Sequence, residues 1–121
     1  MDFKFEKLHI WQTSMVFGEV VFEMTKAFPK EELYNLTSQT RRAVDSISLN
    51  IAEGATGNSQ AEFKKFIGYS LRSLAEVVTC LHKAKLRNYI DEETFQNSYK
   101  QAFDLMNSIA AFRNTLTSIT K

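Results

Sequence analysis

Between Ser59 and Asn88 the chain reads SQAEFKKFIGYSLRSLAEVVTCLHKAKLRN. The first four residues have the spacing of a capping box, in which a serine and a glutamate each satisfy a free backbone amide at a helix start. Apolar and small side chains then recur every three or four residues, which is the repeat of an amphipathic helix. They are Phe63, Phe66, Ile67, Ser70, Leu71, Leu74, Val77, Val78, Leu81 and Ala84. The stretch therefore predicts one long helix that ends near Asn88.

Two helical segments precede this one. The first is expected from about Phe5 to Phe28, because Pro29 cannot continue a helix. The second lies within Glu31–Gly54. A short turn is expected at Glu31–Tyr34, and the main helix begins near Leu36 or Thr37. Along this helix a set of mostly apolar or small side chains repeats at steps of three and four residues. The side chains at these steps are Leu36, Thr40, Ala43, Ile47, Asn50, Ile51 and Gly54.

A fourth segment follows Asp91-Glu92-Glu93, where acidic side chains favour the positive end of a helix dipole. The same apolar period continues through it at Phe95, Ala102, Phe103, Met106, Ile109, Phe112, Leu116 and Ile119. The connections between the four segments are about two to eight residues long, which is typical of antiparallel neighbours in a bundle.

Length and composition fit this arrangement. The chain has 121 residues, of which 44% are hydrophobic and only four are Gly and one is Pro. The length suits one domain, and the scarcity of Gly and Pro disfavours an all-β fold. We predict an all-α protein, a single domain over residues 1–121 that folds as an antiparallel up-down-up-down four-helix bundle.

The first segment carries two apolar stripes instead of the single stripe of an ordinary surface helix. One stripe consists of Leu8, Trp11, Met15 and Phe22, and the other of Phe17, Val20, Val21, Met24 and Phe28. One stripe facing the core and one facing another subunit would explain the pair, with Trp11 or Phe17 as an interface anchor. The alternative is that the ten Phe of the chain simply fill its core.

Basic residues gather in the third segment, although the whole chain has a formal charge of only +1. Six bases and two acids give Ser59–Asn88 a charge of +4, whereas the other residues sum to −3. We predict a nucleic-acid-binding surface if these cations share a face, and a solvated helix face if they do not. The candidates are Arg41, Arg42, Lys64, Lys65, Arg72, Lys83, Lys85 and Arg87.

Two polar residues, Asn50 and Glu53, lie close to the apolar stripe of the second segment. Buried polar groups are generally hydrogen-bonded inside the protein, so we interpret both as structural anchors and keep a ligand-facing role as the alternative.

Signals for catalysis are poor. Glu6-Lys7-Leu8-His9 has the Glu-x-x-His spacing of di-iron bundles, but the second copy that such sites need is missing at His82. Cys80 lies beside the apolar face of its helix, where a thiol acts as a small hydrophobe. We expect no enzyme activity, no catalytic residue, no metal and no cofactor. The N-terminal residues lack the order of a signal peptide and no stretch is apolar enough to span a membrane, so we expect a cytoplasmic protein with no membrane partner.

Several stretches of the chain resemble the bacterial 23S rRNA intervening-sequence proteins. They are Phe28–Gln39, Arg41-Arg42-Ala43, Ser46-Ile47 and Asn50-Ile51-Ala52-Glu53-Gly54, together with Ser59, Glu62-Phe63 and Trp11. Ser48 and Asn35 stand where the family often has Pro and Gly. The resemblance implies a four-helix bundle that assembles into a ring, with pentamers as the known example. It also implies a similarity to the accessory protein of diversity-generating retroelements, which binds a reverse transcriptase and nucleic acid.

Three functions follow from these observations. The first is a non-enzymatic homo-oligomer, pentameric by resemblance, that binds RNA or DNA through the basic residues. The second is a scaffold that binds a protein partner and no nucleic acid. The third is a metal enzyme built on the bundle, which the missing second histidine motif disfavours.

Overall fold

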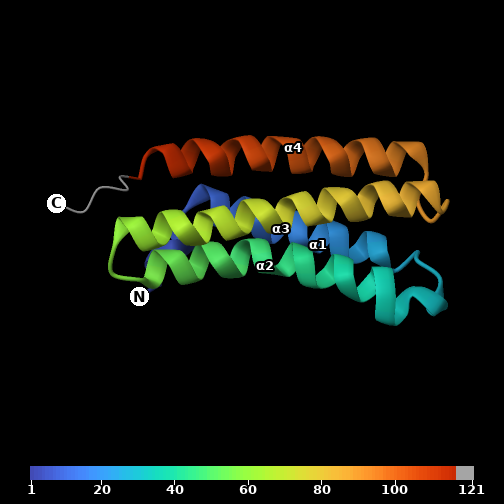
Figure 1. Cartoon of the computed structure of the whole chain (residues 1–121), viewed down its shortest axis with the longest axis horizontal. Helices are drawn as coiled ribbons and strands as arrows, with labels where there is room; N and C mark the ends of the chain where they lie inside the picture. The colour runs from blue at the N-terminus through green and yellow to red at the C-terminus, as the bar shows by residue number, and fades with distance from the viewer. Residues whose placement is uncertain (117–121) are drawn as a thin grey trace.

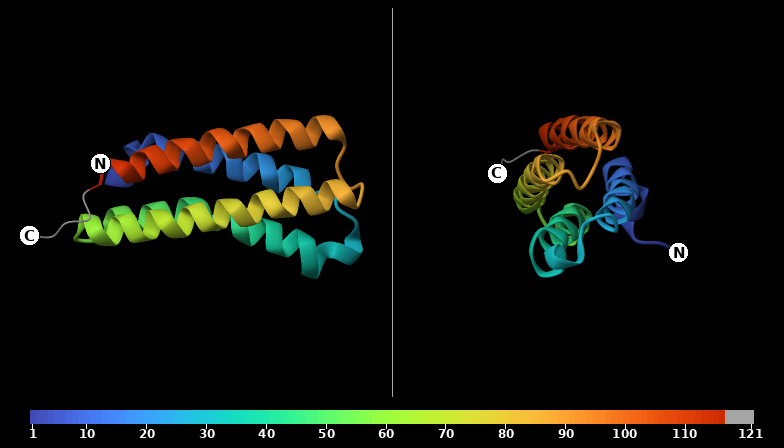
Figure 2. Two further views of the ribbon diagram at one scale, coloured as in Figure 1. Left: turned by 45° about the horizontal axis from the view of Figure 1, so that its top comes forward. Right: turned by 90° about the vertical axis from the view of Figure 1, so that its right-hand side faces the viewer.

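Four main helices pack antiparallel within residues 1–116, as predicted. The computed structural model describes residues 1–116, and its main helices are α1 (His9–Thr25), α2 (Ser38–Thr56), α3 (Gln60–Leu86) and α4 (Glu92–Asn114). Each helix packs on the next along the chain, and α4 packs back on α1, so the bundle closes (Figure 1). Seen end-on, α3 lies between α2 and α4, with α1 across from it (Figure 2).

The helices of the second half of the chain begin with side-chain caps, and at Ser59 the serine half of the predicted capping box is present. The Ser59 hydroxyl accepts a hydrogen bond from the amide of Glu62 (3.0 Å), and the Asp91 carboxylate accepts one from the amide of Thr94 (2.8 Å). Asn88 follows the end of α3 with a φ of 63°, the left-handed conformation in which asparagine commonly closes a helix. Ile119, placed by the sequence on the apolar face of α4, lies outside the described residues.

The prediction of one continuous helix from Phe5 to Phe28 is wrong. A single 3-10 turn (Lys4–Lys7) precedes α1, and Leu8 between them has extended backbone angles. At the other end α1 stops at Thr25, before Pro29. The residue preceding a proline is restricted to extended conformations, so the chain must leave the helix earlier than Phe28.

The connection from α1 to α2 is itself helical. A 3-10 turn (Lys30–Glu32) is followed by a π-helical turn (Leu33–Thr37) that runs into α2. The turn predicted at Glu31–Tyr34 and the start of the main helix are therefore confirmed to within two residues.

The core lies along the inner faces of the helices. Its most deeply buried side chains are Val21, Leu36, Val44, Ile47, Ile51, Ile67, Leu74, Val77, Leu81 and Ile109. Phe17 is only 3% exposed and belongs to this core, which agrees with the core alternative that the sequence left open for it and not with the role of an interface anchor. Phe103, predicted as core, is 57% exposed.

The helices α2 and α3 lie in close contact at Gly54. A Cβ atom built there would lie 2.7 Å from the Cβ of Phe66 and 2.9 Å from the ring of Phe63. These atoms belong to the stem of one side chain and to a ring held against Phe112 at 5.4 Å between centroids, so they have little room to move. Only glycine lets the helices meet at this distance.

We expect Gly54→Ala to lower the free energy of unfolding by about 1–3 kcal/mol, because the added methyl group overpacks the α2–α3 contact. Gly68→Ala is the matched control, since a Cβ there meets nothing within 4 Å. It should raise stability by about 0.5–1 kcal/mol through helix propensity. Urea unfolding of both variants measures the difference, and equal effects at the two sites would contradict the close contact.

Candidate nucleic-acid interface

Three of the eight predicted cations lie along one line on the solvent side of α3. Lys65, Arg72 and Lys83 are exposed and are separated by seven and eleven residues, which are close to two and three whole turns of an α-helix. The line is therefore about 27 Å long, at about 1.5 Å per residue. We call these three residues the α3 basic stripe.

An aromatic side chain lies within the stripe. Tyr69 follows Lys65 by one turn, and the guanidinium of Arg72 lies 6.0 Å from the centre of its ring. Phe66 packs edge-on against Tyr69, with 5.4 Å between ring centres. The one acid on the same line is Glu76, whose carboxylate accepts a hydrogen bond from Gln39 of α2 (3.4 Å).

Two predicted cations point elsewhere because they are bound within the chain. Lys85 forms an ion pair with Glu92 at the start of α4 (2.6 Å), and its ammonium lies 4.6 Å from the ring centre of Phe95. The hydrogen bond from Lys85 also lowers the pKa of the Glu92 carboxyl. Arg87 donates to Glu32 in the α1–α2 connection (2.9 Å). Both bases hold the bundle together, so they are poor candidates for phosphate contacts.

The remaining three predicted cations are distributed around the bundle. Arg42 is exposed on α2, whereas its neighbour Arg41 is half-buried and donates to the hydroxyl of Thr25 in α1 (2.8 Å). Lys64 is half-buried and, one residue before Lys65, points about 100° away from the stripe. The structure does not bring all eight residues to one face.

Glu32 is a buried carboxylate that the sequence analysis did not single out as a tertiary contact. Its oxygens accept four hydrogen bonds: from Tyr89 (2.6 Å), from Arg87 (2.9 Å), from the side chain of Asn35 (3.0 Å) and from the amide of Leu36 (3.2 Å). The bond from Tyr89 is the main reason why the pKa of the Glu32 carboxyl lies below its ordinary value. The same bond raises the pKa of the Tyr89 phenol.

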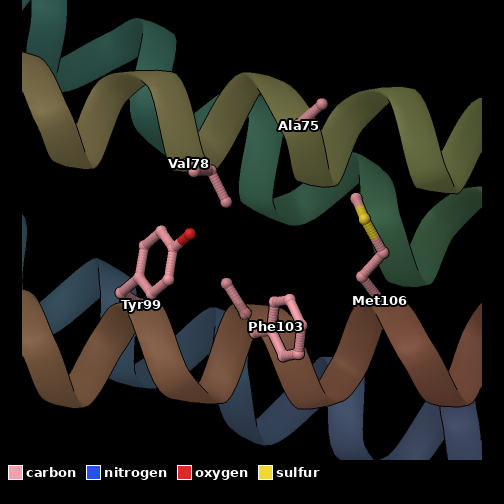
Figure 3. A pocket seen from close by; sticks show the side chains of 6 residues that line it. Ala75, Val78, Tyr99, Phe103 and Met106 are labelled. Atoms are coloured by element: carbon pink, nitrogen blue, oxygen red, sulfur yellow. The ribbon is translucent and has the colours of Figure 1, made fainter.

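An apolar groove of about 200 Å³ runs between α3 and α4 (Figure 3). Ala75 and Val78 line it from α3, and Tyr99, Phe103 and Met106 line it from α4. We call it the α3–α4 groove. The sequence pattern did not indicate this groove, because Phe103 and the neighbouring core residue Ala102 both fall on the apolar repeat of the fourth segment.

A second exposed apolar surface lies on α1 and α2. Met15, Gly18 and Leu49 line a hollow there together with the acids Glu19 and Asp45, and Leu49 is 64% exposed. We call this the α1–α2 surface. Met15 belongs to one of the two apolar stripes that the sequence placed on the first segment. Trp11, from the same stripe, is half-buried and packs edge-on against Phe5, with 5.3 Å between ring centres.

The two polar residues flagged on α2 differ in environment. The Asn50 side chain is half-buried and donates to the carbonyl of Ser46 in its own helix (2.8 Å), while Glu53 is exposed. Asn50 thus has the local backbone bond that a structural anchor needs, and the exposure of Glu53 leaves it outside the core.

The remaining chemical groups are few. Burial raises the pKa of the Cys80 thiol, so this side chain packs as a neutral hydrophobe. No group of three or more His, Cys, Asp or Glu side chains in residues 1–116 is arranged to hold a metal ion. In the same range, none of the helices has the length and hydropathy needed to cross a membrane.

The fold and these surfaces define a class: a closed four-helix bundle with a short basic stripe on α3 and two surfaces that expose apolar side chains. The model of the 23S rRNA-intervening sequence protein family matches residues 6–111, most of the chain, and the protein belongs to that family. The resemblance inferred from the sequence is thereby confirmed. A search of curated proteins found no match.

We expect Glu32→Gln to lower the urea midpoint at pH 7, because the neutral amide is a poorer acceptor for Arg87 and Tyr89. The Glu32 pKa is lowered on folding, so its stabilisation is complete above the unfolded pKa of about 4.5 and is lost as the pH falls through the folded value. The gap between the wild type and the variant should therefore close below about pH 4.5.

Glu31→Gln is the matched control, since Glu31 is exposed and lies next to Glu32 in the chain. Urea unfolding from pH 3 to pH 7 should show little change for this variant. A gap for Glu32→Gln that persists unchanged at pH 3, or an equal gap for Glu31→Gln, would contradict the role assigned to the Glu32 carboxylate.

Proposed function

We propose that the protein is a non-enzymatic, cytoplasmic homo-oligomer that binds RNA or DNA through the α3 basic stripe of each subunit. The observation that carries the proposal is the alignment of Lys65, Arg72 and Lys83 on one exposed line with Tyr69 between them. Cations that follow a phosphate backbone, with an aromatic ring on which a base can stack, suit single-stranded nucleic acid. Contacts of this kind give affinity with little sequence specificity.

Oligomerisation is supported by the two apolar surfaces. In the closed order of helices, the outer side of the α3–α4 pair is opposite the outer side of the α1–α2 pair. When one surface of a subunit binds a different surface of the next subunit, the contacts run head to tail. Such contacts close into a ring when the rotation from one subunit to the next adds up to a full turn. Five subunits is the number that the family resemblance implies, so we propose a pentameric ring in which the groove of one subunit receives the α1–α2 surface of the next.

A protein scaffold without nucleic-acid affinity is the second candidate. The α3–α4 groove favours it, since an exposed apolar surface of this kind also suits a helix of another protein. This candidate predicts no binding of RNA even at low salt.

Reversing the α3 basic stripe tests the main proposal. We expect the triple variant Lys65→Glu, Arg72→Glu and Lys83→Glu to abolish binding of a short single-stranded RNA, measured by fluorescence anisotropy at about 50 mM salt. Three phosphate contacts give a salt slope near −2, so wild-type affinity should fall on the order of 40-fold between 50 and 300 mM salt.

The matched control reverses Lys4, Lys7 and Lys100, which are exposed bases outside α3, and changes the net charge by the same amount. It should keep most of the affinity. Equal losses in the two triple variants would show binding to net charge alone, and the absence of any RNA binding by the wild type would favour the protein scaffold.

The head-to-tail contact is tested by light-scattering mass on a sizing column. We expect Phe103→Ser, in the groove, and Leu49→Ser, on the α1–α2 surface, each to lower the mass to that of a monomer. Mixing the two variants should then give a heterodimer, because each supplies the surface that the other lacks.

Val16→Ser, an exposed apolar residue of α1 outside both surfaces, is the control and should leave the mass unchanged. Each single variant would remain a homodimer if the two surfaces were independent self-complementary interfaces. A wild-type protein that is itself a monomer would contradict the assembly.

A further inference from the structure

A hollow at the corner where α1 passes into α2 differs from the other hollows in its charge. Its volume is about 280 Å³, and three of its lining residues are bases: Lys26, Lys30 and Arg41. No acid lines it. By contrast, the hollow on the α1–α2 surface is lined by two acids, and the α3–α4 groove by no charged residue.

Arg41 is held in place from two sides. Its Nε donates to the Thr25 hydroxyl (2.8 Å), and its guanidinium lies 4.4 Å from the ring centre of Phe22. A guanidinium has five N–H donors, so four remain on the two terminal nitrogens. Within residues 1–116 these donors have no hydrogen-bond partner, and no carboxylate lies within ion-pair distance of them. The group is thus fixed before any ligand arrives.

Thr37 gives an independent indication of a ligand. It is only 4% exposed and lines the hollow, yet its hydroxyl forms no hydrogen bond to any group in residues 1–116. Among the described residues no fully buried side-chain nitrogen or oxygen lacks a hydrogen-bond partner, so the Thr37 hydroxyl, which has none, is accessible from the hollow and can donate to a polar group that enters it.

The acidic residues near the hollow do not neutralise its positive charge. Glu23 is bonded to Lys26 (2.8 Å), but both side chains are more than half exposed, and such a surface pair is easily exchanged. Glu32, in the same connection, is engaged by Arg87 and Tyr89. An anion entering the hollow therefore meets Arg41 and Lys30 with no competing carboxylate on its walls.

We propose that this hollow binds a phosphate group, with the guanidinium fork of Arg41 as its main partner, Lys26 and Lys30 at the rim and the Thr37 hydroxyl as a further donor. An arginine fork matches the geometry of phosphate oxygens. The volume falls just below the roughly 300–1,000 Å³ of pockets for drug-sized ligands, so it suits a small anion or the phosphorylated end of a larger molecule. The site is separate from the α3 basic stripe and does not depend on it.

The test is calorimetric titration of the full chain with inorganic phosphate at low salt and pH 7.5, with chloride as the reference anion. We expect Arg41→Gln to weaken phosphate binding by about tenfold or more, because charge-assisted bonds are lost. Arg42→Gln is the matched control: it removes the same charge one residue away, from a side chain that does not line the hollow, and should change the affinity less than about twofold.

Thr37→Val keeps every charge and nearly the same shape, so it separates a ligand contact from a fold defect. It should weaken phosphate binding several-fold while leaving the urea midpoint nearly unchanged. If Arg41→Gln fails to fold, Thr37→Val and Lys30→Gln decide the question. Phosphate binding no tighter than chloride, or equal losses in Arg41→Gln and Arg42→Gln, would overturn the proposal.

A second arm identifies the source of the phosphate. A 5′-phosphorylated RNA is compared with the same RNA bearing a 5′-hydroxyl, in the protein whose α3 basic stripe has been reversed. A preference for the phosphorylated end that Thr37→Val removes assigns the hollow to nucleic-acid ends. Equal affinity of the two RNAs, with inorganic phosphate still bound, assigns it to a free anion.

Discussion

The carboxylate of Glu32 joins the two connections that meet at one end of the bundle. It receives Asn35 and Leu36 from its own connection and Arg87 and Tyr89 from the connection between α3 and α4. A buried carboxylate is costly unless each oxygen is paired, so the four donors must stay together for the fold to tolerate it. This requirement fixes how α2 lies against the end of α3 and therefore where the stripe, the groove and the corner hollow are placed.

Pairing with carboxylates of the chain likewise divides the bases of Ser59–Asn88 into two groups. Toward its C-terminal end, Lys85 and Arg87 face the connections and α4, where carboxylates neutralise them. On the solvent side, Lys65, Arg72 and Lys83 have no carboxylate within ion-pair distance among the described residues. The charge of +4 carried by Ser59–Asn88 thus becomes a line of three cations at the surface. Counting charges along a chain overstates a binding surface wherever part of the charge closes the fold.

Local signals in the sequence predicted the helices and their caps well. Ser59 and Asp91 act on amides three residues away, so a short window contains the whole interaction. Long-range pairs have no such window: Arg87 and Glu32 are 55 residues apart, and neither position alone indicates the other. The apolar period also gave no warning that Phe103 is exposed, because periodicity reports which face of a helix is apolar and not which neighbour covers that face. The apolar period likewise gave no sign of the break at Leu8 or of the π-helical form of the turn before α2.

The proposed assembly and the proposed nucleic-acid binding would be physically linked. One chain offers three cations along about 27 Å, enough for about three phosphates and a correspondingly shallow salt dependence. Contacts of this kind give weak, non-specific binding when they act alone. A ring repeats the stripe at fixed spacing, and each stripe after the first binds a strand that is already held nearby, so affinity rises without any new type of contact. The contribution of the α3 basic stripe to affinity therefore depends on the apolar surfaces that would bring its copies together. A monomeric variant with all three cations intact should bind long RNA far more weakly than the ring does. The same variant should bind a short RNA fragment about as well as the ring.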